Sequence, residues 1–114
     1  MELRDRWDIS YSVEEIKDDR ISKRVLIKIK NHSPYKRTFK IYTDAINIKD
    51  QFANLRFRLY YNLMVPKYIT IEKYGKEEVE VLIPHILNKG EDDHVVIAIE
   101  NVDKNEVKKI KVYV

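Results

Sequence analysis

The chain of 114 residues contains no cysteine, only two glycines and three prolines, and no long apolar run. The lack of cysteine excludes a disulfide framework, a thiolate nucleophile and a cysteine-ligated metal. The apolar runs are too short to cross a membrane, so we expect no membrane insertion. The charged start MELRDRWDIS has no apolar segment of a secretory signal. We therefore expect a cytoplasmic protein if Met1 is the natural start, and a cell-surface protein if the chain is an excised fragment.

The composition is that of one folded domain. Hydrophobic residues make up 44% of the chain and charged residues 36%, and the length suits a single domain over residues 1–114. A disordered chain does not contain this much isoleucine, valine and tyrosine. The enrichment in Lys, Glu and Ile resembles the composition of hyperthermophilic proteins, which predicts a thermophilic source.

Apolar and polar residues alternate along most of the chain, which is the pattern of half-buried β-strands. In NLRFRLYYNL, for example, Leu55, Phe57 and Leu59 face one way and Arg56 and Arg58 the other. The segment 12–21 is predicted to be one helical turn or a loop, and Tyr11 and Tyr61 are predicted to lie in the core. The predicted strands cover residues 7–13, 23–31, 38–44, 54–63, 68–74, 77–83, 94–100 and 108–114.

This pattern predicts an all-β fold, namely a single immunoglobulin-like β-sandwich of seven to nine antiparallel strands. A small β-barrel is the main alternative. Three segments carry a family resemblance: VLIKIKN (25–31), ITIEKYGKEEVEVLIP (69–84) and HVVIAIENVDKNEVKKIKVYV (94–114). They resemble the strands and closing hairpin of bacterial and archaeal immunoglobulin-like modules. That resemblance implies a non-catalytic spacer, surface assembly part or partner-binding domain, for instance in accessory proteins of archaeal surface filaments.

The charges are strongly segregated along the chain. Residues 20–68 contain twelve basic and two acidic side chains, a net charge of +10, although the whole chain carries only +3. Either these residues form a basic sheet face that meets an acidic partner, or neighbouring acidic strands neutralise them. The residues predicted to contact a partner are Lys28, Lys30, Lys40, Arg56 and Arg58 as charges, with Tyr42 and Tyr60 as aromatic anchors.

No motif for catalysis or for a cofactor is present, so we expect no enzyme, no cofactor, no metal and no small-molecule substrate. The acidic loop GEDDH (90–94) lacks the ligand spacing of a calcium loop, and the three histidines are far apart in sequence. The prediction is a non-catalytic interaction or assembly module. It binds a protein partner, possibly another copy of itself, through a sheet face or edge. The alternative is a nucleic-acid-binding protein that uses the basic face of residues 20–68.

Overall fold

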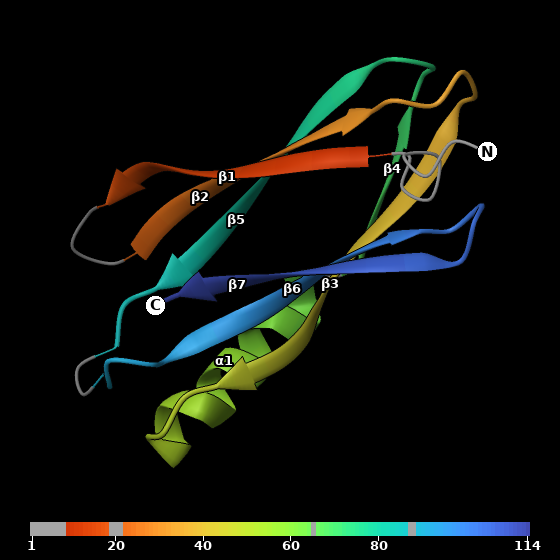
Figure 1. The fold of residues 1–114 in the computed structure, drawn as a ribbon. Helices are drawn as coiled ribbons and strands as arrows, with labels where there is room; N and C mark the ends of the chain where they lie inside the picture. Colours follow the sequence, from red (N-terminus) through yellow and green to blue (C-terminus); the bar gives the residue numbers. More distant parts are fainter. Residues whose placement is uncertain (1–8, 19–21, 65, 87–88) are drawn as a thin grey trace.

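The computed structural model describes residues 9–18, 22–64, 66–86 and 89–114. These residues form seven strands and one helix (Figure 1). In chain order they are β1 (Ile9–Asp18), β2 (Ser22–Asn31), β3 (Arg37–Asn47), α1 (Gln51–Met64), β4 (Lys67–Ile71), β5 (Lys76–Pro84), β6 (His94–Asn101) and β7 (Glu106–Tyr113).

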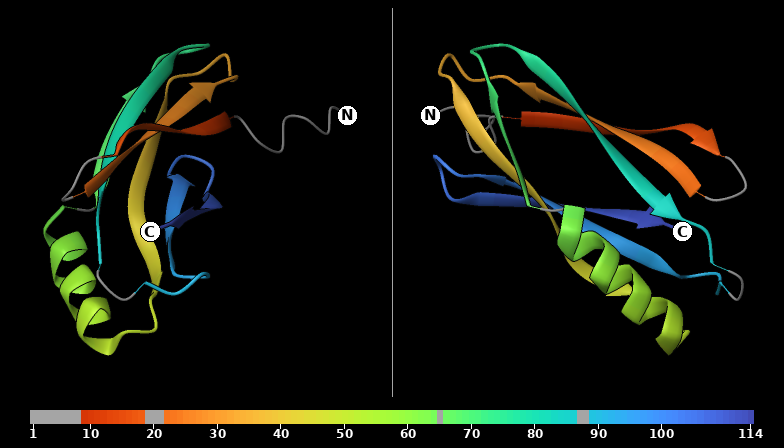
Figure 2. Two further views of the ribbon diagram at one scale, coloured as in Figure 1. Left: turned by 90° about the vertical axis from the view of Figure 1, so that its left-hand side faces the viewer. Right: turned by 180° about the vertical axis from the view of Figure 1, so that it is seen from behind.

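The strands form two antiparallel sheets that face each other across one core (Figures 1 and 2). One sheet has the order β1-β2-β5 and the other has the order β4-β3-β6-β7. The predicted two-sheet antiparallel sandwich is thereby confirmed, and α1 is an addition to it.

Alternation along the strands builds the core. Every second residue points inward and is at most 2% exposed, as in Val25, Ile27 and Ile29 of β2, Phe39 and Ile41 of β3, and Val95, Ile97 and Ile99 of β6. Removing each such side chain from water contributes about 1.5–3 kcal/mol to folding. These strands were correctly predicted because their apolar residues are mostly β-branched and follow a period of two.

The prediction of a strand over residues 54–63 is wrong, because this segment is part of the helix α1. The helix begins after Asp50, whose carboxylate oxygen Oδ1 accepts hydrogen bonds from the backbone N–H groups of Phe52 (3.0 Å) and Ala53 (3.1 Å). This is the bonding pattern of a helix N-cap. No β-branched residue lies between Gln51 and Met64, so this segment lacks the isoleucine, valine and threonine side chains that favour a strand.

Helix α1 lies where the four-stranded sheet is incomplete. The short strand β4 pairs only with Arg37–Ile41, so the second half of β3 has no strand on that side. There the Nδ2 atom of Asn54 donates hydrogen bonds to the carbonyl oxygens of Ile46 (3.2 Å) and Ile48 (3.1 Å). Phe57, only 2% exposed, joins the core from the same helix. The helix thus replaces a strand as the partner of this part of β3 (Figure 2).

Strand β1 is longer and more exposed than predicted. The segment 12–21 was expected to be a helical turn or loop, but β1 continues through a bulge after Glu15 to Asp18, and residues 19–21 lie outside the described residues. Tyr11 was predicted to lie in the core, yet it is 36% exposed, because β1 is an edge strand covered by β2 on one side only. The predicted first strand also included Trp7, which lies outside the described residues.

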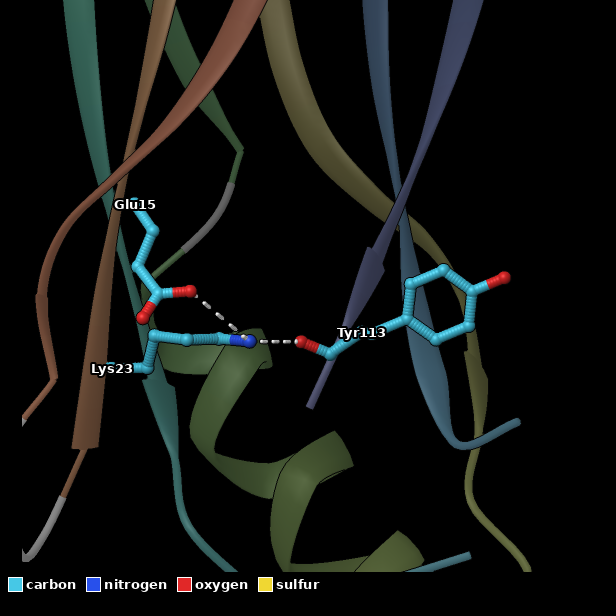
Figure 3. A network of polar contacts seen from close by, with 3 residues as sticks. All are labelled: Glu15, Lys23 and Tyr113. Carbon is cyan, nitrogen blue, oxygen red and sulfur yellow. Dashed lines mark hydrogen bonds and ion pairs between the residues drawn. The ribbon is translucent and has the colours of Figure 1, made fainter. Parts of the chain in front are cut away.

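A lysine at the start of β2 bridges the two sheets (Figure 3). Lys23 lies two residues before the inward-pointing Val25 and so points to the same inner face, where its side chain is only 15% exposed. Its Nζ atom donates a hydrogen bond of 2.6 Å to the carbonyl oxygen of Tyr113 in β7, and lies 3.9 Å from Oε2 of Glu15. One of the cations counted in the basic segment therefore holds the sheets together rather than facing a partner.

A buried asparagine ties the turn between β2 and β3 to the end of β4. Asn31 is fully buried. Its Nδ2 atom donates to the carbonyl oxygens of Tyr35 (2.8 Å), Ile71 (3.2 Å) and Glu72 (3.2 Å). Its Oδ1 atom accepts a hydrogen bond of 2.9 Å from the backbone N–H of Ser33. One side chain thus bonds four backbone groups from two segments that are distant in sequence.

Candidate functional site

The residues predicted to contact a partner are spread over three surfaces. Lys28 and Lys30 lie on the outer face of the β1-β2-β5 sheet. Lys40 and Tyr42 lie on the outer face of the other sheet, and Arg56 and Arg58 lie on α1. Tyr60 also belongs to α1, but its side chain lies outside the described part of the structure. The single basic sheet face predicted for residues 20–68 does not form, because these residues belong to different sheets and to a helix.

Acidic neighbours neutralise much of the charge on the outer face of the β1-β2-β5 sheet. The Nζ atom of Lys28 lies 2.9 Å from Oε2 of Glu14 in β1. The Nε atom of Arg24 lies 3.3 Å from Oε1 of Glu80 in β5. Cross-strand pairing of opposite charges is therefore the correct interpretation of Lys28 and Arg24. Lys30 differs, since Lys76 stands directly opposite it in β5.

The ion pair raises the pKa of the Lys28 amine above its usual value of 10.5. The main cause is the hydrogen bond to Glu14, followed by the charge of Glu14, with a smaller contribution from Glu78. Because the folded-state pKa is the higher one, this pairing contributes fully to stability below the unfolded-state pKa. The contribution disappears as the pH rises through the folded-state value.

We expect Glu14→Gln to lower the pKa of Lys28 toward its usual value, because both main causes act through Glu14. Glu78→Gln is the matched control and should lower the pKa less. The pKa can be followed through the chemical shifts of the Lys28 side-chain carbons in an alkaline NMR titration. A larger decrease in the Glu78 variant than in the Glu14 variant would show that the pairing is assigned to the wrong strand.

The outer face of the β4-β3-β6-β7 sheet combines lysines with tyrosine rings. The Nζ atom of Lys40 lies 5.0 Å from the ring centroid of Tyr42 and 6.0 Å from that of Tyr68. Lys111 lies 5.9 Å from the ring centroid of Tyr113 in the same way. Tyr68 is 59% exposed and Tyr113 is 47% exposed, whereas Tyr42 is half-buried. This face has the aromatic surface that protein interfaces and nucleic-acid platforms share.

Helix α1 presents three large apolar side chains to solvent. Phe52 is 73% exposed, Leu55 is 56% exposed and Leu59 is 60% exposed. Their spacing of i, i+3 and i+7 places them on one side of the helix, and the exposed Arg56 occupies position i+4. We call Phe52, Leu55, Arg56 and Leu59 the helix face. Figure 2 shows no described strand on the outer side of the helix.

The two arginines of α1 point to different flanks of the helix. Residues two positions apart are separated by about 200° around a helix, so Arg56 and Arg58 do not share a face as a strand would require. Nε of Arg58 donates a hydrogen bond of 2.7 Å to Oδ1 of Asn54. Arg56 instead lines a pocket on the other flank.

Hollows lie on both flanks of α1. The first has a volume of about 230 Å³ and is mostly apolar; Ala53, Arg56, Phe57, Leu59, Pro84, His85 and Ile86 line it. The second has a volume of about 390 Å³, and Ile48, Gln51, Asn54, Leu55 and Arg58 line it. Leu55 and Leu59 of the helix face thus each stand beside a hollow.

The sequence prediction missed the helix face because it assigned Leu55, Arg56 and Leu59 to a strand and placed Phe52 in no element. Two signals mark the correct structure. Asp50 is a strong N-cap residue directly before the apolar segment. Pro66 follows shortly after Met64, where a helix must end.

In the acidic loop before β6, the buried carboxylate forms hydrogen bonds with backbone N–H groups. Asp93 is only 2% exposed, and its carboxylate accepts hydrogen bonds from the backbone N–H groups of Gly90 (2.7 Å) and Lys49 (3.2 Å). His94 contacts the side chain of Asn47 and the carbonyl oxygen of Asp92. Within the described ranges, no group of three or more His, Asp or Glu side chains is arranged to hold a metal ion.

No protein-family model matches the chain, and neither a curated protein nor a solved structure matches it significantly. Among the helical residues that the structure describes, none belong to a helix with the length and apolar character needed to cross a membrane.

Proposed function

We propose that this protein is a non-catalytic interaction module that binds a protein partner mainly through the helix face of α1. The observation that carries this proposal is the exposure of Phe52, Leu55 and Leu59 on one side of one helix. Contiguous exposed apolar side chains of this size mark interaction sites in soluble proteins. Proteins that function alone usually bury such residues against their own core.

The spacing of the helix face supports a specific mode of binding. Apolar anchors at i, i+3 and i+7 are the pattern with which a helix enters an apolar groove on another protein. Phenylalanine and leucine supply the buried area, and Arg56 supplies a charge at the edge of it. The segment Gln51–Met64 contains two arginines and no acidic residue, so a groove with acidic residues along its rim is the complementary surface.

The pocket beside Arg56 also supports this proposal, because it can receive a side chain of the partner. Its lining is mostly apolar and comes from α1 and from the segment after β5. A volume of about 230 Å³ accommodates one large apolar side chain of a partner. Binding energy in protein interfaces concentrates at such anchored side chains, where water is fully excluded.

We further propose that the sandwich is immunoglobulin-like and acts as a rigid support for the helix. The sheet orders β1-β2-β5 and β4-β3-β6-β7 support this, because each sheet combines strands from both halves of the chain, as Greek-key connections require. In this architecture α1 occupies the connection between β3 and β4. Connections of a rigid sandwich commonly carry its binding residues.

The test is a comparison of three proteins as affinity baits in extract from the source organism. Wild type and the control Val107→Ser are expected to retain one common partner, whereas Phe52→Ser with Leu59→Ser loses it. Val107 is a fair control because it is 43% exposed but lies on β7, away from α1. For the purified partner, the dissociation constant of the double variant should be at least about 30-fold higher than that of wild type, as expected for the loss of hot-spot side chains.

The proposal fails if the double variant retains every partner that wild type retains. It also fails if purified partners bind wild type and the double variant with the same affinity. Phe52 and Leu59 are exposed and contribute little to the core, so we expect the double variant to stay folded. A circular dichroism spectrum like that of wild type then excludes unfolding as the cause of a lost partner.

Nucleic-acid binding is the second candidate, now on a different surface from the one that the sequence predicted. The observation in its favour is that two lysines, Lys40 and Lys111, lie against tyrosine rings on the outer face of the β4-β3-β6-β7 sheet; the rings are those of Tyr42, Tyr68 and Tyr113. Its test is a titration of labelled single-stranded DNA and RNA at increasing salt. Binding that weakens steeply with salt and is lost in Lys40→Ala with Tyr68→Ala would favour this candidate over the first.

A further inference from the structure

The strands that the structure describes leave four sheet edges, and one of these edges lacks the usual protection. The edges are β1 and β5 in one sheet, and β4 and β7 in the other. An edge strand offers unpaired backbone N–H and C=O groups to any other strand, and proteins block such pairing with charges or with very short strands. The four edges can therefore be compared by their charges and lengths.

Three of the edges are protected in this way. Strand β4 has only five residues and begins with a lysine. Strand β5 begins with the charged run Lys76-Glu77-Glu78, and β7 carries Lys108, Lys109 and Lys111. In contrast, the first five residues of β1, Ile9 to Val13, carry no charge at all. The start of β1 is thus the edge most open to another strand.

The sequence of this segment is nearly the same in both directions. It reads Ile-Ser-Tyr-Ser-Val, with Tyr11 at its centre. If two copies pair antiparallel about Tyr11, then Tyr11 lies opposite Tyr11, Ser10 opposite Ser12, and Ile9 opposite Val13. Aromatic pairs, serine pairs and aliphatic pairs are all favourable across antiparallel strands. A two-fold axis requires this kind of self-complementary surface.

The exposure of β1 shows what a second copy would cover. Tyr11 and Val13 lie opposite the buried Ile29 and Ile27 of β2, so they belong to the inner face of the sheet. They nevertheless remain 36% and 41% exposed. The amine of Lys108 in β7 lies 5.5 Å from the Tyr11 ring centroid and covers part of that ring. Apolar surface of the sandwich is therefore left open along β1.

We propose that two copies of this protein associate through β1, antiparallel and centred on Tyr11. The two three-stranded sheets then become one continuous sheet with the order β5-β2-β1-β1-β2-β5. This inference does not rest on the helix face, since β1 and α1 are separate surfaces. The uncharged segment spans only Ile9–Val13 and Glu14 follows it, so the pairing is short and the dimer dissociates on dilution.

Sedimentation of the full chain from micromolar to millimolar concentration tests the association. We expect a monomer–dimer equilibrium for wild type, a monomer for Val13→Lys, and an unchanged equilibrium for Val107→Lys. The two valines are matched, because both lie on edge strands and are 41% and 43% exposed. A wild type that stays monomeric throughout overturns the proposal. So does a dimer that survives Val13→Lys but is lost in Leu55→Ser, which would assign self-association to the helix face.

Cysteine variants test the register without depending on how a lysine is tolerated. The chain has no cysteine of its own, so each variant carries a single thiol. Tyr11→Cys places two thiols directly opposite each other, with Cβ atoms about 4.5–5.5 Å apart. A small approach of the strands brings them within the roughly 3.5–4.5 Å that a disulfide spans. In Val13→Cys the two thiols are about 13 Å apart along the strands and should not join. Faster disulfide formation in Val13→Cys than in Tyr11→Cys contradicts the proposed register.

Discussion

Replacing Phe57 with alanine is expected to lower the free energy of unfolding by about 3–5 kcal/mol, the usual cost of removing a buried aromatic ring. Phe57 is 2% exposed and is the side chain by which α1 enters the core. Its loss leaves a cavity where the helix meets the core, beside the hollow that Ala53, Pro84 and Ile86 also line. The surroundings cannot easily fill this cavity, because Asn54 holds the helix backbone near β3.

The matched control is Phe52→Ala in the same helix. Phe52 is 73% exposed, so its replacement should change the free energy of unfolding by no more than about 0.5 kcal/mol. Urea unfolding of both variants measures the difference through the denaturation midpoint, provided that the slope m is unchanged. Equal effects of the two substitutions would mean that Phe57 does not fix α1 to the sandwich.

The same pair of variants separates folding from binding. Phe52→Ala should weaken binding of the partner without lowering the stability of the fold, because the Phe52 side chain faces solvent in the free protein. Phe57→Ala should weaken binding of the partner only indirectly, because it loosens the helix that presents Phe52, Leu55 and Leu59. A partner that tolerates Phe52→Ala but not Phe57→Ala would point to the sandwich, and not to the helix face, as the binding surface.

The helix shows where sequence patterns were ambiguous. In NLRFRLYYNL the apolar residues alternate, as in a strand, yet Leu55, Leu59 and Phe52 also satisfy a helical spacing. The residue types separate the two patterns. The strands β2 and β6 contain isoleucine and valine at most inward positions, whereas Gln51–Met64 contains none. Propensity therefore decided the structure in a segment where periodicity alone did not.

The candidate site was harder to predict than the strands, because it depends on how strands are ordered in space. Lys28 and Lys40 both alternate with core residues, and nothing in the sequence tells that they belong to opposite sheets. The neutralisation of Lys28 depends on β1 as its neighbour, and Glu14 comes from the acidic start of the chain. Likewise, the exposure of Tyr11 follows from the edge position of β1, since alternation alone places this ring inside.

Replacing Asn31 with alanine is expected to lower the free energy of unfolding by about 3 kcal/mol, because buried backbone groups lose their hydrogen-bond partner. The amide group of the Asn31 side chain donates hydrogen bonds to three backbone carbonyl oxygens, and its oxygen accepts one from the backbone N–H of Ser33. Alanine removes all four interactions but leaves the backbone groups in place. Each buried polar group without a partner costs about 1–3 kcal/mol, partly relieved where water enters.

Asn47→Ala is the matched control for Asn31→Ala. Asn47 is also a strand residue and bonds one side chain, His94, at 2.9 Å, but it is exposed. Water replaces its lost hydrogen bond, so the free energy of unfolding should change by less than about 0.5 kcal/mol. Because the backbone carbonyls around Asn31 stay polar, Asn31→Leu should not restore stability either. An Asn31 variant as stable as the Asn47 variant would show that the turn after β2 and the end of β4 are held together by packing alone.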